Sequence, residues 1–117
     1  MGPALFPLFT ECATLALTLK RYEEAKALLR KTIPVARRVF GKNDALTLTM
    51  RSTYAMALYY NTDATLDDLR EAVTTLEEIE RTAQRVLGGA HPDTAAIEEA
   101  LRLARAAIRA RETPGDA

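Results

Sequence analysis

Residues 86–94 read Val-Leu-Gly-Gly-Ala-His-Pro-Asp-Thr and carry the strongest structural signal in the chain. The two glycines favour the end of one helix and Pro92 favours the first turn of the next, so this stretch predicts a joint between two helices. Residues 39–47, which read Val-Phe-Gly-Lys-Asn-Asp-Ala-Leu-Thr, keep the two apolar residues, the glycine and the threonine at the same relative places, 47 positions upstream. Two such joints are typical of a helical repeat.

The composition is that of a globular protein. Of the 117 residues, 48% are hydrophobic and 27% charged, and 16 acidic side chains balance 16 basic ones. This size and balance predict one domain and give no indication of nucleic acid as a partner. One cysteine, Cys12, excludes an internal disulfide, and with a single histidine the sequence has no cluster of thiols and imidazoles to hold zinc. We expect no metal and no cofactor.

The first nineteen residues are apolar, but they do not resemble a targeting segment. No basic residue precedes Lys20, and Glu11 interrupts the apolar run. We therefore expect neither a signal peptide nor a membrane span, and a cytoplasmic location.

The spacing of apolar residues predicts five helices. The first, about 3–19, is apolar on every side and must be covered on every side. The second and fourth, about 22–40 and 65–87, each have one apolar stripe, which ends with Val39 and Phe40 in the second helix and with Val86 and Leu87 in the fourth. The third and fifth span about 45–60 and 92–111, and the fifth has the polar outer face expected at the end of a helical stack.

Local signals mark several positions within these helices. Asn43 or Asp44 is predicted to cap the third helix, and Thr65 with Asp68 resembles a capping box for the fourth. Glu77 and Arg81, four residues apart, predict an ion pair in the fourth helix. Pro34 predicts a kink in the second helix.

Two motifs resemble the tetratricopeptide repeat family. Residues 21–25, Arg-Tyr-Glu-Glu-Ala, begin eight positions after Ala13 and resemble the family's "GRYEEA" signature. Residues 86–94 resemble the "VLG..HPDT" joint of the kinesin-light-chain-like type, and the likeness covers roughly residues 12–107. The resemblance implies repeats of two antiparallel helices, about 42 residues long.

The chain departs from this family at two kinds of position. Lys20 stands where the family has a turn glycine. In the kinesin-light-chain-like type, paired asparagines on the first helix of a repeat bind the backbone of an extended peptide. Residues 10–11, Thr-Glu, and 52–53, Ser-Thr, stand at the matching positions, so the clamping asparagines are absent.

We therefore expect an all-α fold of stacked antiparallel helix hairpins, a five-helix fragment of a tetratricopeptide-like α-solenoid. The predicted domain covers residues 1–112, and residues 113–117 are predicted to be a disordered tail. Within the domain, repeat one covers about 3–41, repeat two about 44–88 and a C-terminal capping helix about 92–111.

Most reactive side chains have a structural interpretation that outweighs a chemical one. His91 belongs to the joint and has no second histidine as partner, Cys12 fits a buried core position, and the acids at 63, 67, 68 and 71 fit a helix start. Seven basic residues are predicted to form a solvated face, with contact to nucleic acid or an anionic partner as the alternative: Lys20, Arg21, Lys26, Arg30, Lys31, Arg37 and Arg38.

The sequence thus predicts a protein–protein interaction module, a scaffold or adaptor without catalytic activity. The concave groove is predicted to include Glu11, Thr14, Ser52 and Tyr59. Because two and a half repeats are few for stability, the first helix is predicted to be an association face for a protein partner or a second copy of the chain, through Leu5, Phe6, Leu8 and Phe9. The alternative is a small structural subunit built permanently into a larger assembly.

Overall fold

The computed structural model describes residues 15–112, and all regular secondary structure within that range is helical. The all-α fold class is confirmed. Residues 15–18 are helical, and four complete helices follow: α2 (Tyr22–Phe40), α3 (Ala45–Tyr59), α4 (Leu66–Val86) and α5 (Pro92–Glu112). Most of the predicted first helix lies outside the described residues.

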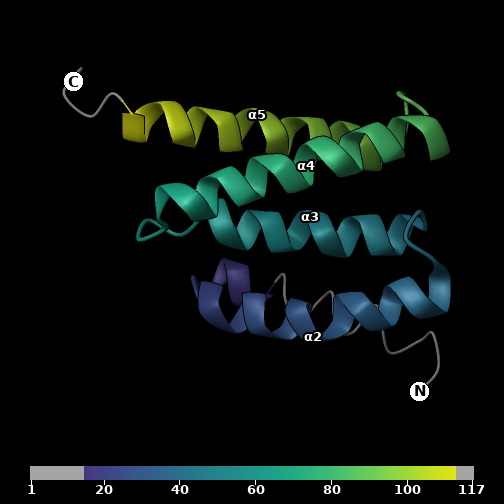
Figure 1. The fold of residues 1–117 in the computed structure, drawn as a ribbon, viewed down its shortest axis with the longest axis horizontal. Helices are drawn as coiled ribbons and strands as arrows, with labels where there is room; N and C mark the ends of the chain where they lie inside the picture. Colours follow the sequence, from purple (N-terminus) through teal and green to yellow (C-terminus); the bar gives the residue numbers. More distant parts are fainter. Residues whose placement is uncertain (1–14, 113–117) are drawn as a thin grey trace.

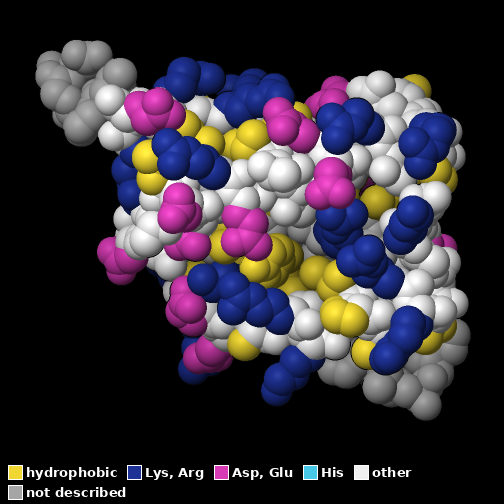
Figure 2. Space-filling model, in the orientation of Figure 1, with side chains coloured by type: hydrophobic (Ala, Val, Ile, Leu, Met, Phe, Trp, Pro, Cys, Tyr) yellow, Lys and Arg dark blue, Asp and Glu magenta, His cyan; other side chains and the backbone are white. Residues whose placement is uncertain are grey.

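Successive helices run antiparallel and lie side by side (Figure 1). Helix α3 contacts α2, α4 and α5, and α4 also packs along α5. Among these four helices α2 contacts α3 alone, so the backbones of α2 and α4 stay apart on either side of α3. The surface is hollowed at the level of α3, with hydrophobic side chains at the bottom of the hollow (Figure 2).

The two joints predicted from the sequence contain glycines with nearly the same backbone φ. Gly41 and Gly88 have φ angles of +96° and +91°, in the half of conformational space that glycine occupies most easily. In each joint, a buried threonine hydroxyl of the following helix donates to a carbonyl of the preceding one: Thr47 to Ala36 at 3.5 Å and Thr94 to Ala83 at 3.5 Å. The 47-residue spacing seen in the sequence is therefore a structural repeat.

The turn before α2 ends the preceding helix without a glycine. Lys20 has a φ of +62°, its N–H donates to the carbonyl of Leu17 at 3.0 Å, and the N–H of Arg21 donates to the carbonyl of Ala16 at 2.7 Å. These two bonds form a Schellman motif, whose left-handed position is usually glycine. Lys20 thus adopts the backbone conformation of the glycine that it replaces.

The predicted helix caps are confirmed. Asp44 caps α3 by accepting a bond from the N–H of Leu46 at 2.9 Å. Thr65 and Asp68 form a capping box for α4, in which each side chain accepts a bond from the other residue's N–H at 3.1 Å. These bonds satisfy donors that a helix start would otherwise leave unpaired.

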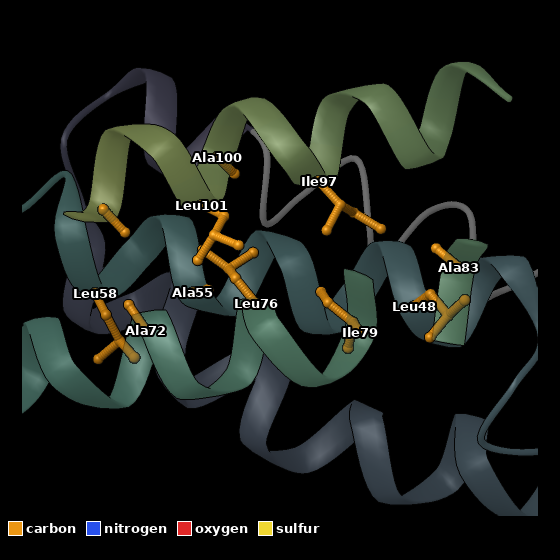
Figure 3. Packing of buried hydrophobic residues seen from close by; sticks show 11 residues of the cluster. Leu48, Ala55, Leu58, Ala72, Leu76, Ile79, Ala83, Ile97, Ala100 and Leu101 are labelled. Carbon is orange, nitrogen blue, oxygen red and sulfur yellow. The ribbon is translucent and has the colours of Figure 1, made fainter. Parts of the chain in front are cut away.

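The main core fills the space between α3, α4 and α5, as Figure 3 shows for its labelled side chains. Leucine and isoleucine side chains alternate with alanines, which let the helices approach closely. The cluster comprises Leu48, Ala55, Leu58, Ala72, Leu76, Ile79, Ala83, Ile97, Ala100, Leu101 and Ala104. A smaller cluster of Leu29, Ala36 and Met50 joins α2 to α3.

Two valines that the sequence assigns to the apolar stripes of α2 and α4 are exposed, although the next residues, Phe40 and Leu87, pack against the core clusters. Val39 is 56% exposed and Val86 is 46% exposed, so their assignment to the buried stripes was wrong. Both belong to the last turn of a helix, beside a joint, where no neighbouring helix of the described range covers them. No helix within residues 15–112 combines the length and the hydropathy needed to cross a membrane.

Candidate functional site

Helix α3 presents different residues on its two open sides. Tyr54 is two positions from both Ser52 and Met56, and residues two apart in an α-helix point about 200° from each other. Arg51 and Tyr54 line a cavity between α2 and α4, whereas Ser52 and Met56 line a depression beside α5. The molecule therefore has two candidate binding surfaces, one on each side of α3.

The first surface is the α3–α5 depression, a shallow cavity of about 110 Å³. Its α3 wall consists of small hydroxyl side chains and a methionine, and its α5 wall contributes an acid, an alanine and an isoleucine. The lining residues are Thr49, Ser52, Thr53, Met56, Asp93, Ala96 and Ile97. Hydroxyl side chains on α3 and an alanine on α5 therefore face one depression together with larger apolar side chains.

The hydroxyl groups in the α3–α5 depression supply its polar chemistry. Thr53 donates a hydrogen bond to the carbonyl of Thr49 at 3.0 Å, so its hydroxyl oxygen can still accept one. Ser52 is 7% exposed, and its hydroxyl forms no hydrogen bond to any other residue of the described range. Ser52 can therefore donate to, or accept from, a peptide backbone.

The predicted groove residues do not all lie in this depression. Ser52 does, but Tyr59 packs against the main core cluster. The Tyr59 hydroxyl is buried with no hydrogen-bond partner among residues 15–112, and the ring of Tyr60 meets that of Tyr59 edge-on at 4.8 Å between centroids. Burial raises the pKa of Tyr59, and the neighbouring Tyr60 raises it further. Glu11 and Thr14 lie outside the described residues.

The predicted association face also lies outside the described residues, with Leu5, Phe6, Leu8 and Phe9, as does Cys12. Two leucines at the start of the described range are exposed, Leu15 by 59% and Leu19 by 57%.

Several of the side chains that sequence analysis assigned to structural roles form contacts within the described residues. The Nδ1 atom of His91 accepts a hydrogen bond from the N–H of Asp93 at 3.0 Å, directly before α5. Asp67 pairs with Arg70 at 3.7 Å, and Glu71 accepts a hydrogen bond from Tyr54 at 3.0 Å. No group of three or more metal-ligating side chains occurs within residues 15–112.

The second surface, the α2–α4 groove, was not predicted from the sequence. Its apolar end measures about 210 Å³ and is lined by Arg30, Ile33, Pro34, Arg51, Tyr54 and Thr75. Its basic end measures about 530 Å³ and is lined by Arg37, Lys42, Asn43, Arg51, Glu78, Arg81, Thr82 and Arg85. The basic face predicted for α2 contains Arg37, but nothing in the sequence indicates that Arg81 and Arg85 of α4 lie beside it.

A tyrosine-centred network connects the three helices at the apolar end of the α2–α4 groove. The Nε of Arg30 donates to the hydroxyl of Tyr54 at 3.3 Å, and that hydroxyl donates to Glu71 at 3.0 Å. The Arg30 guanidinium also lies over the Tyr54 ring, 5.7 Å from its centroid. The hydrogen bond to Tyr54 is the main cause that raises the pKa of Arg30, which stays protonated.

Comparison with known proteins gives one family match. Residues 13–46 match the family model described as tetratricopeptide repeat, a stretch that contains all of α2 and the joint after it. No curated protein and no solved structure matches the chain. The match and the antiparallel helices together support a tetratricopeptide repeat at residues 13–46.

Proposed function

We propose that this chain is a non-catalytic protein–protein interaction module, a scaffold or adaptor that holds an extended peptide segment in the α3–α5 depression. The observation that carries the proposal is the pair of walls around that depression, small hydroxyl side chains on α3 and an exposed alanine on α5. A tetratricopeptide repeat supports the same conclusion, since stacked repeats create extended concave binding surfaces.

We further propose that the chain follows the kinesin-light-chain-like type in its joints and differs from it in its groove. Residues 86–94 carry the joint motif of that type. Its peptide-clamping asparagines are replaced on α3 by Ser52 and Thr53, so hydroxyls would bind the peptide backbone in their place. A hydroxyl supplies one O–H donor where an asparagine amide supplies two N–H donors, so we expect fewer hydrogen bonds to the peptide backbone.

We propose that the domain is divided as the sequence predicts, into repeat one, repeat two and a capping helix. Helices α3 and α4 form the second hairpin, and α5 covers both, which is the position of a cap. Its outward-facing charges, such as Glu98 and Arg102, suit the exposed end of a stack.

A display screen with variants of the depression tests the proposal. Random linear peptides on phage would be selected against the full chain, and the affinity of selected peptides measured by fluorescence polarisation. Ala96→Trp should weaken binding by about tenfold or more because an indole fills the depression. Ser52→Ala should weaken it less, by the loss of one hydrogen bond.

The matched control is Ala95→Trp, which places the same side chain on an exposed neighbouring position of α5 outside the depression. Retained affinity in Ala96→Trp, or equal losses in both tryptophan variants, would contradict binding in this depression.

A second candidate function is a small structural subunit of a larger assembly. The exposed Leu15 and Leu19 favour it, because they continue toward the predicted association face at Leu5, Phe6, Leu8 and Phe9. Light scattering at high protein concentration would distinguish the two candidates. A stable monomer that binds no dye for apolar surface would exclude the structural subunit and a homo-oligomer, whereas self-association reduced by Leu15→Glu and Leu19→Glu would support them.

A further inference from the structure

The α2–α4 groove combines two chemistries in one continuous surface. Its apolar end and its basic end share Arg51, which lines both cavities. In the view of Figure 2 the hollow shows hydrophobic side chains at its floor, with lysine or arginine side chains and some aspartate or glutamate side chains around it. A ligand that extends along the groove would therefore meet an apolar pocket first and a cluster of cations next.

The basic end contains many more positive charges than negative ones. Five cationic side chains, Arg37, Lys42, Arg51, Arg81 and Arg85, line it with one carboxylate, Glu78. This excess stands out because acids and bases balance over the whole chain, 16 against 16. Like charges gathered around one cavity repel each other, and a bound anion relieves that repulsion.

The one carboxylate at the basic end already has a partner. Glu78 pairs with Arg51 at 3.5 Å across α3 and α4. Within residues 15–112, the other four cations of the cavity form no ion pair, and all four are exposed. They are therefore available to an external anion, at the rim of a cavity large enough for several ligand atoms.

The apolar end is preorganised for a small hydrophobic group. The contacts of Tyr54 with Arg30 and Glu71 hold the floor and both walls together. Ile33 and Pro34 on α2 and Thr75 on α4 leave about 210 Å³ between them, room for one aliphatic side chain. Restricting the wall side chains before binding reduces the entropy lost on binding.

We propose that the α2–α4 groove binds an acidic peptide segment of a partner protein, with one aliphatic side chain in the apolar end and carboxylates in the basic end. Charge complementarity favours this occupant, and the apolar pocket beside the cations distinguishes a peptide from a simple anion. Nucleic acid fits less well, because Arg30 already covers the Tyr54 ring, the one aromatic side chain lining the groove in the described range. The proposal is independent of the α3–α5 depression.

Binding of a synthetic probe tests this groove directly. The probe is a fluorescein-labelled peptide with one leucine followed by glutamates, titrated with the full chain at low salt. We expect saturable binding that weakens as salt is added, since exposed charges are screened. Replacing the glutamates by glutamines should abolish binding, and replacing the leucine by alanine should weaken it severalfold.

Charge-reversal variants locate the binding site. Arg37→Glu with Arg81→Glu should weaken binding by about tenfold or more. The matched control is Lys31→Glu with Arg70→Glu, which changes the net charge equally on the same two helices but lies outside the groove. Equal losses in both double variants would mean attraction by net charge alone and would overturn the proposal.

Three further readouts complete the test. Amide chemical shifts should move at Thr75 and Thr82 in the groove and stay unchanged at Ser52 and Ala96 on the other side of α3. A single-stranded oligonucleotide of equal charge should bind more weakly than the peptide, and equal or tighter binding would reassign the groove to nucleic acid. Ala96→Trp should leave the acidic probe's affinity unchanged, so this proposal and the proposed function can fail separately.

Discussion

Asp44 and His91, 47 positions apart, cap α3 and α5 with the same hydrogen bond. The Asp44 carboxylate accepts from the N–H of Leu46 at 2.9 Å, and the His91 imidazole accepts from the N–H of Asp93 at 3.0 Å. The backbone on either side also matches, since the N–H groups of both residues donate to the carbonyl of the joint glycine. The histidine of the second joint therefore has the role that an aspartate has in the first.

His91→Ala should lower the free energy of unfolding by about 1 kcal/mol, because it removes the side-chain acceptor at the start of α5. His91→Asn should retain most of that stability, since asparagine caps helices well and adds no charge beside Asp93. Urea unfolding at neutral pH measures both. If the alanine and asparagine variants lost equal stability, ring packing rather than capping would explain the histidine.

Lys20→Gly should raise the free energy of unfolding by about 0.5–1 kcal/mol. Lys20 has a φ of +62°, where a side chain is strained and glycine is not. Thermal unfolding measures the gain, and Lys20→Ala serves as control because it removes the charge but keeps a Cβ. A gain of equal size in the alanine variant would point to charge and contradict relief of backbone strain.

Pro34→Ala should stabilise α2 by about 1–3 kcal/mol. Pro34 is exposed inside α2, where it cannot donate the helical hydrogen bond and its ring crowds the preceding turn. The control is Pro92→Ala at the first position of α5, where no such bond is needed, and it should change stability by less than about 0.5 kcal/mol. Circular dichroism during chemical unfolding compares the two variants, and equal effects would refute the explanation.

Tyr59→Phe should raise the free energy of unfolding by about 1 kcal/mol at neutral pH, because it removes a buried hydroxyl without a partner. It should also flatten the loss of stability at alkaline pH. The folded state raises the pKa of Tyr59, so stability is fully present below the unfolded value of about 10 and falls as pH rises above it.

Unfolding at about pH 8 and about pH 11 measures this alkaline effect, with the unfolded tyrosine pKa near 10 between the two. Tyr60→Phe is the control, since Tyr60 is 42% exposed and keeps its ring against Tyr59. A pH dependence that Tyr60→Phe flattens as much as Tyr59→Phe would contradict the burial of the Tyr59 hydroxyl as its cause.

The helices and their caps could be predicted because they depend on nearby residues. The glycines at 41 and 88, the acceptor at Asp44 and the box at Thr65 and Asp68 act within one helical turn. The threonines at 47 and 94 repeat in the sequence, although their hydrogen bonds to the preceding helix are visible only in the structure.

Contacts between helices could not be predicted in the same way. Spacing predicts an ion pair between Glu77 and Arg81, but the structure pairs Glu77 with Arg105 of α5 at 2.8 Å. The α2–α4 groove was missed for the same reason, since Arg37 and Arg81 come together only when α2 and α4 pack on either side of α3. The candidate depression was partly predicted, through Ser52, from its place in a family motif.

The two matching joints bound a segment of the chain that could be duplicated as a repeat unit. A segment cut after Gly41 and again after Gly88 begins and ends in the same backbone conformation. A second copy of residues 42–88, inserted at either cut, would join α4 to α3 through a glycine with nearly the same φ as the joints already present. We expect a chain lengthened by one such hairpin to extend both the α3–α5 depression and the α2–α4 groove.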